Sequence, residues 1–170
     1  MRNILVSIAL VLLAILPAQA QKMAYIDTEY VLANIPTFKA AQDQLDQISR
    51  QYQKELEAMS NELDKIYKDY RAESVLLSAD MKKKREDVIV TKEKELKQKQ
   101  KEYFGENGLL FKKRQDLVDP IQKEVYRAIE TVSKKGSYGM VFDKASGVSL
   151  LYSDPRYDIS DDVLKEMGYK

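Results

Sequence analysis

The sequence predicts a mostly helical α+β fold, in which a long antiparallel coiled-coil hairpin stands on a small β-strand body. Apolar residues recur every three or four positions over 38–70 and every seven over 89–117. Such a spacing, with a mean near 3.5, keeps one helix face against a partner helix. No proline interrupts the chain between Pro36 and Pro120, so two unbroken arms are allowed. Alternating apolar residues and turn residues near both ends predict the body.

The two apolar stripes meet in register if the chain folds back near Ala79. A single turn position then satisfies five successive levels of the seam. With about 40 residues per arm at roughly 1.5 Å rise, the hairpin would be about 60 Å long. The predicted facing pairs are Tyr70 with Ile89, Leu63 with Leu96, Leu56 with Tyr103, Ile48 with Leu110, and Ala41 with Leu117.

The first twenty residues have the features of a signal peptide. Arg2 supplies a positive charge, residues 4–16 are apolar, and residues 18–20 have the small–x–small form that signal peptidase recognises. The apolar run is shorter than the ~20 residues of a spanning helix, which disfavours a retained anchor. We expect cleavage after Ala20 and export to the periplasm. The cleavage site carries no cysteine, which excludes lipoprotein attachment.

The composition excludes several kinds of chemistry. The chain contains no Cys and no His, so it offers no disulfide, no thiolate or imidazole zinc ligand and no histidine-based triad. Glycosidase-type carboxylate pairs stay open by residue type, but no pocket-forming fold is predicted to hold them. We expect no enzyme, no cofactor and no metal. The acidic residues that could form a cation site are Asp154, Asp158, Asp161 and Asp162. Their spacing matches no EF-hand loop, and the expected start of the last helix explains Asp161 and Asp162, so a cation site is disfavoured.

Charge is balanced over the chain but unevenly placed. The sequence has 28 basic and 27 acidic residues, and loss of Arg2 with the signal peptide leaves 27 of each. Between Lys82 and Lys101, nine basic residues stand against four acidic ones, a local charge of +5. This basic zone favours acidic partners such as acidic lipid or polypeptide. Export argues against nucleic acid as a partner.

The first arm has a clear start in the sequence. Thr28 is the expected cap of a short helix that reaches Ala33. Pro36 interrupts the chain, so the first long helix is expected to begin near Thr37.

The return helix should begin after Ser78, its expected N-cap, and stop at Gly136, just after two lysines. Gly105 and Gly108 weaken this helix, but the heptad stripe passes through them, so we expect a bend rather than a break. Pro120 is expected to kink it. Gly105, Gly108 and Pro120 are therefore the hinge candidates.

The body is predicted from strands at 22–26, 138–142 and 148–152, with a turn at 144–147. Ser160 is the expected cap of a last helix that ends before Gly168. Such a small core needs partners, so we expect oligomerisation through it. The expected contact residues are Tyr25, Ile26, Val141, Phe142, Leu150 and Leu151. The predicted division is 1–20 signal peptide, 21–36 body, 37–117 arm and 118–170 body.

The tip of the hairpin carries the candidate binding residues. Apolar residues at an exposed extremity can hold another protein, and cations beside them add electrostatic contact. Plain structural interpretations, loop packing and a solvated helix face, stay open. The candidates are Val75, Leu76, Leu77, Met81, Lys82, Lys83, Lys84 and Arg85.

Five short motifs, in order along the mature chain, resemble the OmpH/Skp family of periplasmic chaperones. They are Ala24-Tyr25-Ile26-Asp27 with Val31-Leu32, Leu117-Val118-Asp119-Pro120-Ile121, Ala128-Ile129 with Val132, Gly139-Met140-Val141-Phe142-Asp143, and Asp158-Ile159-Ser160-Asp161-Asp162-Val163-Leu164. The resemblance implies a homotrimer with a shared β body. It also implies that three helical arms enclose a cavity for unfolded outer-membrane proteins, without ATP and without catalytic residues.

Two functions follow as hypotheses. The first is an ATP-independent holdase chaperone for unfolded outer-membrane proteins. The second is a structural adaptor of the cell envelope, because coiled-coil seams more often serve scaffolding than chaperoning.

Overall fold

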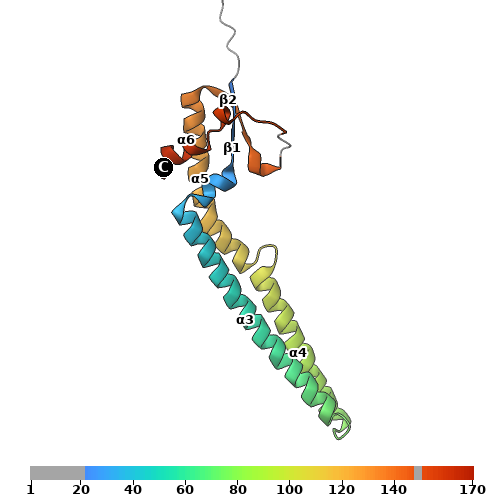
Figure 1. Cartoon of the computed structure of the whole chain (residues 1–170). Helices are drawn as coiled ribbons and strands as arrows, with labels where there is room; N and C mark the ends of the chain where they lie inside the picture. The colour runs from blue at the N-terminus through green and yellow to red at the C-terminus, as the bar shows by residue number, and fades with distance from the viewer. Residues whose placement is uncertain (1–21, 148–150) are drawn as a thin grey trace, which may run out of the picture. The chain divides into compact units, whose positions relative to one another are not determined.

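The computed structural model describes residues 22–147 and 151–170. The signal-peptide prediction, and the part of the third predicted strand at 148–150 that includes Leu150, lie outside the described residues. Residues 151–152 form no strand. The mostly helical α+β class is confirmed (Figure 1). In chain order the elements are β1 (Lys22–Ile26), α2 (Thr28–Ala33), α3 (Pro36–Glu73), α4 (Ala79–Phe104), α5 (Leu109–Gly136), β2 (Tyr138–Asp143), the 3-10 helices η1 (Lys144–Ser146) and η2 (Pro155–Tyr157), and α6 (Ser160–Glu166).

The described chain divides into two compact units. The first, here called the body, holds residues 22–31, 128–147, 151–168 and 170. The second, here called the arm, holds residues 32–127 and 169. Helix α5 contributes its first part to the arm and its last part to the body. No helix within the described ranges has the length and apolarity needed to cross a membrane.

The body is organised around β1. This strand pairs in parallel with β2, with Ala24 opposite Val141 and Tyr25 opposite Phe142. On its other side Tyr25 forms a bridge to Asp158. Parallel strands need a long crossover between them, and here the whole arm provides it. The outer edge of β2 has no strand partner among the described residues.

Apolar side chains from both ends of the chain form the body core. Burying them removes apolar area from water, which stabilises a domain by about 25 cal/mol per Å². The core residues are Ala24, Tyr25, Ile26, Val31, Ala128, Val132, Ile159, Val163 and Leu164.

The caps of α2 and α6 differ from those predicted. Asp27, not Thr28, accepts the backbone N–H of Tyr30 at the start of α2, while the Thr28 hydroxyl donates to Asp143. Ser160 does not cap α6 but is its first residue. Its Oγ accepts the Asp27 backbone N–H at 2.9 Å. Both predictions were wrong because partners more than 100 positions away take these hydroxyls.

The C-terminus of α5 differs from the usual helix end, in which a glycine with positive φ follows the last helical residue. Gly136 is the final helical residue, and Ser137 adopts the left-handed conformation with φ 55°. A Cβ at Gly136 would lie 2.2 Å from the Tyr138 ring. Glycine is therefore needed here for close approach of that ring rather than for a positive φ.

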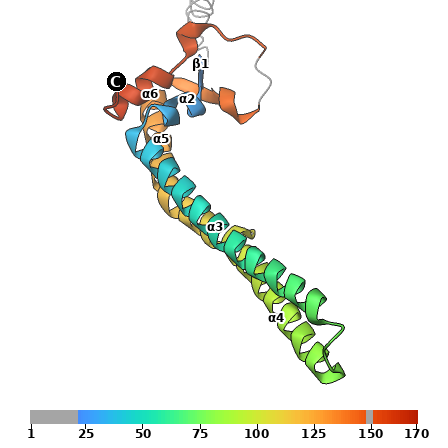
Figure 2. The same ribbon diagram turned by 60° about the horizontal axis from the view of Figure 1, so that its bottom comes forward.

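The hairpin of the arm is confirmed, with α3 and α4 side by side in both ribbon views (Figures 1 and 2). Helix α3 begins at Pro36, one residue before the predicted start, because proline fits the first turn of a helix. Ser78 is the N-cap of α4 as predicted, and its Oγ accepts from the Met81 backbone N–H.

The return helix breaks at 105–108, where a continuous bent helix was predicted. Helix α4 ends at Phe104 and α5 starts at Leu109. Gly105 is extended, with ψ 169°, and the Gly108 N–H bonds the Gly105 carbonyl to form a turn. Cβ atoms would meet backbone oxygens at 2.3 Å at Gly105 and 2.7 Å at Gly108. Helix α5 runs on through Pro120, so the kink there stays a prediction.

The seam between α3 and α4 combines a few buried apolar residues with tyrosine–carboxylate bonds. Leu63 and Ile89 are buried as predicted. Tyr103, predicted to face Leu56, stacks on Tyr52 at 4.0 Å between ring centroids. The polar bonds across the seam join Tyr67 to Glu93, Tyr70 to Glu86, Tyr103 to Glu55, Lys92 to Glu62, and Arg85 to Glu73.

We expect Gly105→Ala to lower the free energy of unfolding by about 1–3 kcal/mol, because the new methyl group overlaps the Lys101 carbonyl. Chemical denaturation followed by circular dichroism measures this. Glu106→Ala in the same turn is the matched control, and equal stability of the two variants would contradict the prediction.

We expect Ser160→Ala to lower the free energy of unfolding by about 1–3 kcal/mol. Ser160 is only 3% exposed, and its loss leaves the Asp27 N–H without an acceptor. Thermal unfolding measures the change. Ser146→Ala is the control, since water can replace its exposed hydroxyl bond. A loss no larger than that of the control would refute the role of this bond.

The arm should lose stability in alkali. Hydrogen bonds to Glu93, Glu86 and Glu55 raise the pKa values of Tyr67, Tyr70 and Tyr103. A raised folded-state pKa contributes stability that is complete below the unfolded value of about 10 and is lost as pH rises through the folded value.

Ultraviolet titration of tyrosinate should therefore show late-ionising phenols, one fewer of them in Tyr70→Phe. Tyr126→Phe is the control, because Tyr126 is an exposed residue of α5 that lies outside the seam between α3 and α4. Equal titration curves for the two variants would count against the cross-arm bonds.

Candidate functional site

The acidic residues of the body serve local structure. Hydrogen bonding to Arg156 lowers the pKa of Asp154, and bonds from Lys170 and Tyr30 lower the pKa of Asp161. Within the described ranges no three acidic side chains are grouped to hold a metal ion. The functional candidates predicted from the sequence are surfaces of the arm and of the body.

The tip of the arm presents the predicted apolar group to solvent. Val75 and Leu76 are each 87% exposed, Met81 is 53% exposed, and Leu77 is half-buried. The turn that carries them is held by the Ser74 N–H bonding to the Tyr70 carbonyl and the Leu76 N–H bonding to the Glu73 carbonyl. A compact turn thus holds apolar side chains outward, which is typical of contact surfaces.

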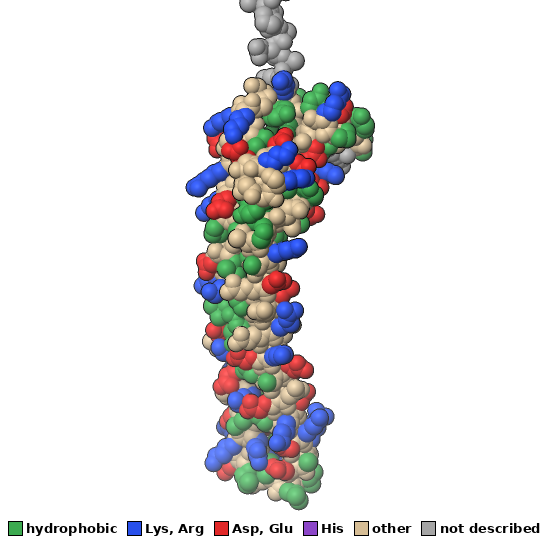
Figure 3. All heavy atoms as spheres, turned by 60° about the vertical axis from the view of Figure 1, so that its left-hand side comes forward, with side chains coloured by type: hydrophobic (Ala, Val, Ile, Leu, Met, Phe, Trp, Pro, Cys, Tyr) green, Lys and Arg blue, Asp and Glu red, His purple; other side chains and the backbone are tan. Residues whose placement is uncertain are grey.

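The predicted basic run adjoins this apolar group. Arg85 is bound to Glu73 across the seam at 3.0 Å, so it contributes to closing the hairpin. Lys82, Lys83 and Lys84 form no ion pair in the described part of the chain. Figure 3 shows hydrophobic side chains at the end of the arm with Lys and Arg side chains around them. The tip can therefore offer apolar contact and positive charge together.

The body presents a second candidate surface at the open edge of β2. Phe142 and Met140 are exposed on this strand, and Val141 is half-buried. Beyond it, Leu151 is almost fully exposed. An open strand edge with apolar side chains invites pairing with another chain. Tyr25 and Ile26, also predicted as contacts, are buried inside a single chain.

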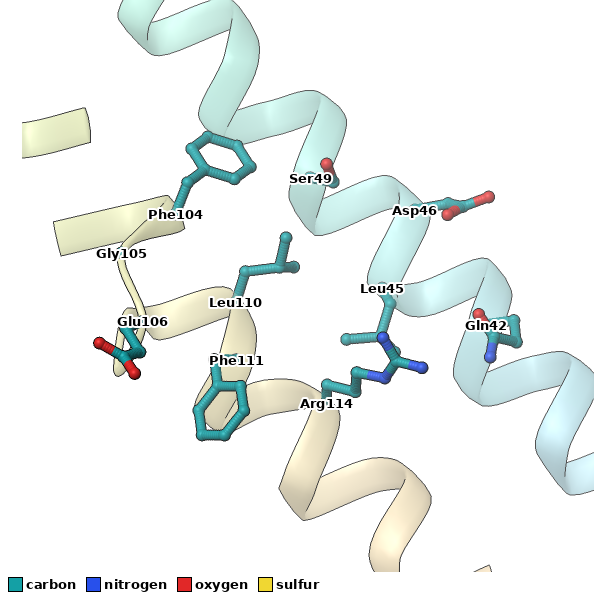
Figure 4. Close-up of a pocket in the computed structure, with 10 residues that line it drawn as sticks. All are labelled: Gln42, Leu45, Asp46, Ser49, Phe104, Gly105, Glu106, Leu110, Phe111 and Arg114. Carbon is teal, nitrogen blue, oxygen red and sulfur yellow. The ribbon is translucent and has the colours of Figure 1, made fainter. Parts of the chain in front are cut away.

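A third surface, not predicted from the sequence, lies in the arm where α4 gives way to α5. Here the turn at 105–108 opens a groove of about 420 Å³ against α3. Leu45 and Leu110 form its apolar floor, and Phe104 and Phe111 are 39% and 44% exposed beside it (Figure 4). The Asn107-Gly108 pair, a common turn signal, was the clue to this break.

A polar rim surrounds this groove. In Figure 4 the Arg114 side chain extends from α5 toward α3, whereas the carboxylates of Asp46 and Glu106 point away from Leu110. Arg114 forms no ion pair within residues 22–147 and 151–170. The groove is thus apolar below and cationic on one side.

Comparisons with known proteins agree with this architecture. The model of the family described as outer membrane protein (OmpH-like) matches residues 22–167. The chain is 28% identical over 167 residues to the chaperone protein Skp of Yersinia enterocolitica, covering 95% of this chain and 94% of that protein. A solved structure of an OmpH-like protein from Caulobacter crescentus shares the fold, with a TM-score of 0.67 and 17% identity. The structural match covers 86% of this chain and 83% of the Caulobacter crescentus chain. With a family match over nearly all of the described chain, the protein belongs to the OmpH-like family.

Proposed function

We propose that this chain is an ATP-independent chaperone that binds unfolded outer-membrane proteins and prevents their aggregation. The observation that carries the proposal is an arm whose exposed tip combines apolar side chains with lysines that form no described ion pair. The similarity to the Skp chaperone supports the same function. Such a surface can hold clients of different sequence, since neither apolar contact nor charge demands one partner geometry.

The chaperone is proposed to act in the periplasm after removal of residues 1–20. The small–x–small site at 18–20 supports cleavage after Ala20. Unfolded outer-membrane proteins pass through that compartment with apolar strands that are meant for lipid. The proposal includes no enzymatic step, because binding alone prevents the apolar strands of different client molecules from associating.

The working form is proposed to be a homotrimer built through the body. The open edge of β2 and the exposed Phe142 support this assembly, and Leu151 extends the apolar surface. Three arms on one shared body would enclose a space for a client. Tyr25 and Ile26 then support the interface from inside their own chain rather than contacting a partner.

The arm tips are also proposed to contact acidic lipid. Lysines 82, 83 and 84 attract anionic headgroups, while Val75 and Leu76 can enter the interfacial region. The hinge positions Gly105, Gly108 and Pro120 are proposed to let each arm adjust to clients of different size.

The mature protein should keep a denatured outer-membrane β-barrel protein soluble at stoichiometric amounts without nucleotide, as measured by light scattering. Replacing Val75 and Leu76 by Ser should weaken client affinity about tenfold, since it removes roughly 1–2 kcal/mol of apolar burial.

Val90→Ser, which alters an exposed apolar residue of α4 away from the tip, is the control. Aggregation that proceeds at every ratio of wild-type protein to client would sink the proposal. Capture of one folded envelope protein, without binding of unfolded chains, would favour the adaptor instead.

Solution mass should equal three chains, and Phe142→Asp should shift it toward one chain by placing a charge in the proposed interface. Sedimentation equilibrium measures both. A charge at position 142 disturbs assembly only if a partner chain covers Phe142. Tyr126→Asp is the control, because it places the same charge on an exposed part of α5 and should leave the mass unchanged. A wild-type protein that stays a monomer at all concentrations would rule out the trimer.

A further inference from the structure

The groove between α3 and the start of α5 combines an apolar floor, in which Leu45 is buried and Leu110 is half-buried, with exposed aromatic side chains at its border. Leu45 and Leu110 line it, and the exposed Phe104 and Phe111 lie beside it. Its volume of about 420 Å³ falls within the range of small-ligand sites, about 300–1,000 Å³. It can therefore hold a few side chains but not a folded element.

The chemistry of the groove favours an aromatic occupant. Phe104 already meets Tyr52 edge-on, and Tyr52 stacks on Tyr103, so an aromatic cluster borders the groove. A further ring placed there would extend this edge-to-face packing, which adds to simple apolar burial. Aliphatic side chains would gain the burial but not the ring geometry.

Arg114 adds a charge argument. Its guanidinium lies over the groove and has no described ion-pair partner, while the nearby carboxylates point outward (Figure 4). The face of an aromatic ring carries the negative part of its quadrupole, and a planar guanidinium stacks on it well. The cationic side of the groove is thus complementary to a ring face.

We propose that this groove binds aromatic side chains of unfolded outer-membrane proteins, with the ring seated on Leu45 and Leu110 and its face toward Arg114. The inference rests on the proposed chaperone function and names the client feature that the arm recognises. Membrane β-strands carry girdles of aromatic residues at both ends of their apolar band. An unfolded client therefore presents such rings repeatedly, and aromatic-rich segments would be held preferentially.

The test uses the mature protein and two labelled synthetic peptides, one alternating serine with tyrosine and the other alternating serine with leucine. Fluorescence anisotropy should show tighter binding of the tyrosine peptide. Arg114→Gln should weaken that binding about two- to fivefold, as expected for an exposed cation–aromatic contact. Arg114→Lys should weaken it less, and Lys113→Gln, a neighbouring cation that does not line the groove, should not change it.

Ser49→Phe fills the groove from α3 and should weaken the tyrosine peptide about tenfold. If this variant loses helical circular dichroism, Arg114→Gln, at an exposed position, decides the question alone. Equal affinity for the two peptides, or unchanged binding in Arg114→Gln, would overturn the inference. A changed solution mass in Ser49→Phe would also overturn it by assigning the groove to a second copy.

The two proposals fail separately. If the wild-type protein prevents aggregation but the groove variants bind peptide normally, the groove inference fails and the chaperone function stands. If the tyrosine peptide binds in the groove but aggregation proceeds, the chaperone function fails.

Discussion

The parallel pairing of β1 with β2 is the constraint on which the chain depends. It joins residues 22–26 to residues 138–143, so everything between them must leave the sheet and return. An antiparallel helical hairpin returns the chain to its start, whereas a single long helix could not. The bonds from Thr28 to Asp143 and from Asp27 to Ser160 fasten the same junction. Closing the long segment between β1 and β2 costs conformational entropy. Burial of Ala24, Tyr25 and Ile26 in β1 and these hydrogen bonds offset that cost.

The arm reaches its length with little apolar burial. Leu63 and Ile89 are buried in the α3–α4 seam, and hydrogen bonds from tyrosines to glutamates cross the same seam. Surface ion pairs of the kind that Arg85 and Glu73 form contribute only about 0–1 kcal/mol each. A hairpin held in this way keeps most of its surface polar. Most of its exposed large apolar residues lie where the helices stop, at the tip and at the turn between α4 and α5, although Val88, Val90 and Tyr126 are exposed along the helices.

The same two glycines explain both the break and the groove. Gly105 and Gly108 allow backbone atoms to approach where a Cβ would overlap a carbonyl oxygen. Helix α4 ends at Phe104 and α5 begins at Leu109, whereas α3 is continuous from Pro36 to Glu73. At this break the arm carries a groove with an apolar floor and a polar rim that includes Arg114, Asp46 and Glu106.

The sequence by itself determined the helical hairpin, the turn capped by Ser78 and the positions of β1 and β2, because hydrophobic periodicity and local capping are properties of neighbouring residues. It did not determine whether Gly105 bends or breaks the helix, since the heptad stripe and the glycines predict opposite outcomes. Only the tertiary structure decided that Thr28 and Ser160 bond residues 115 and 133 positions away instead of capping their own helices. A hydroxyl can bond either a local or a distant partner at similar energy, and only the folded chain brings the distant Asp27 N–H and Asp143 carboxylate within reach.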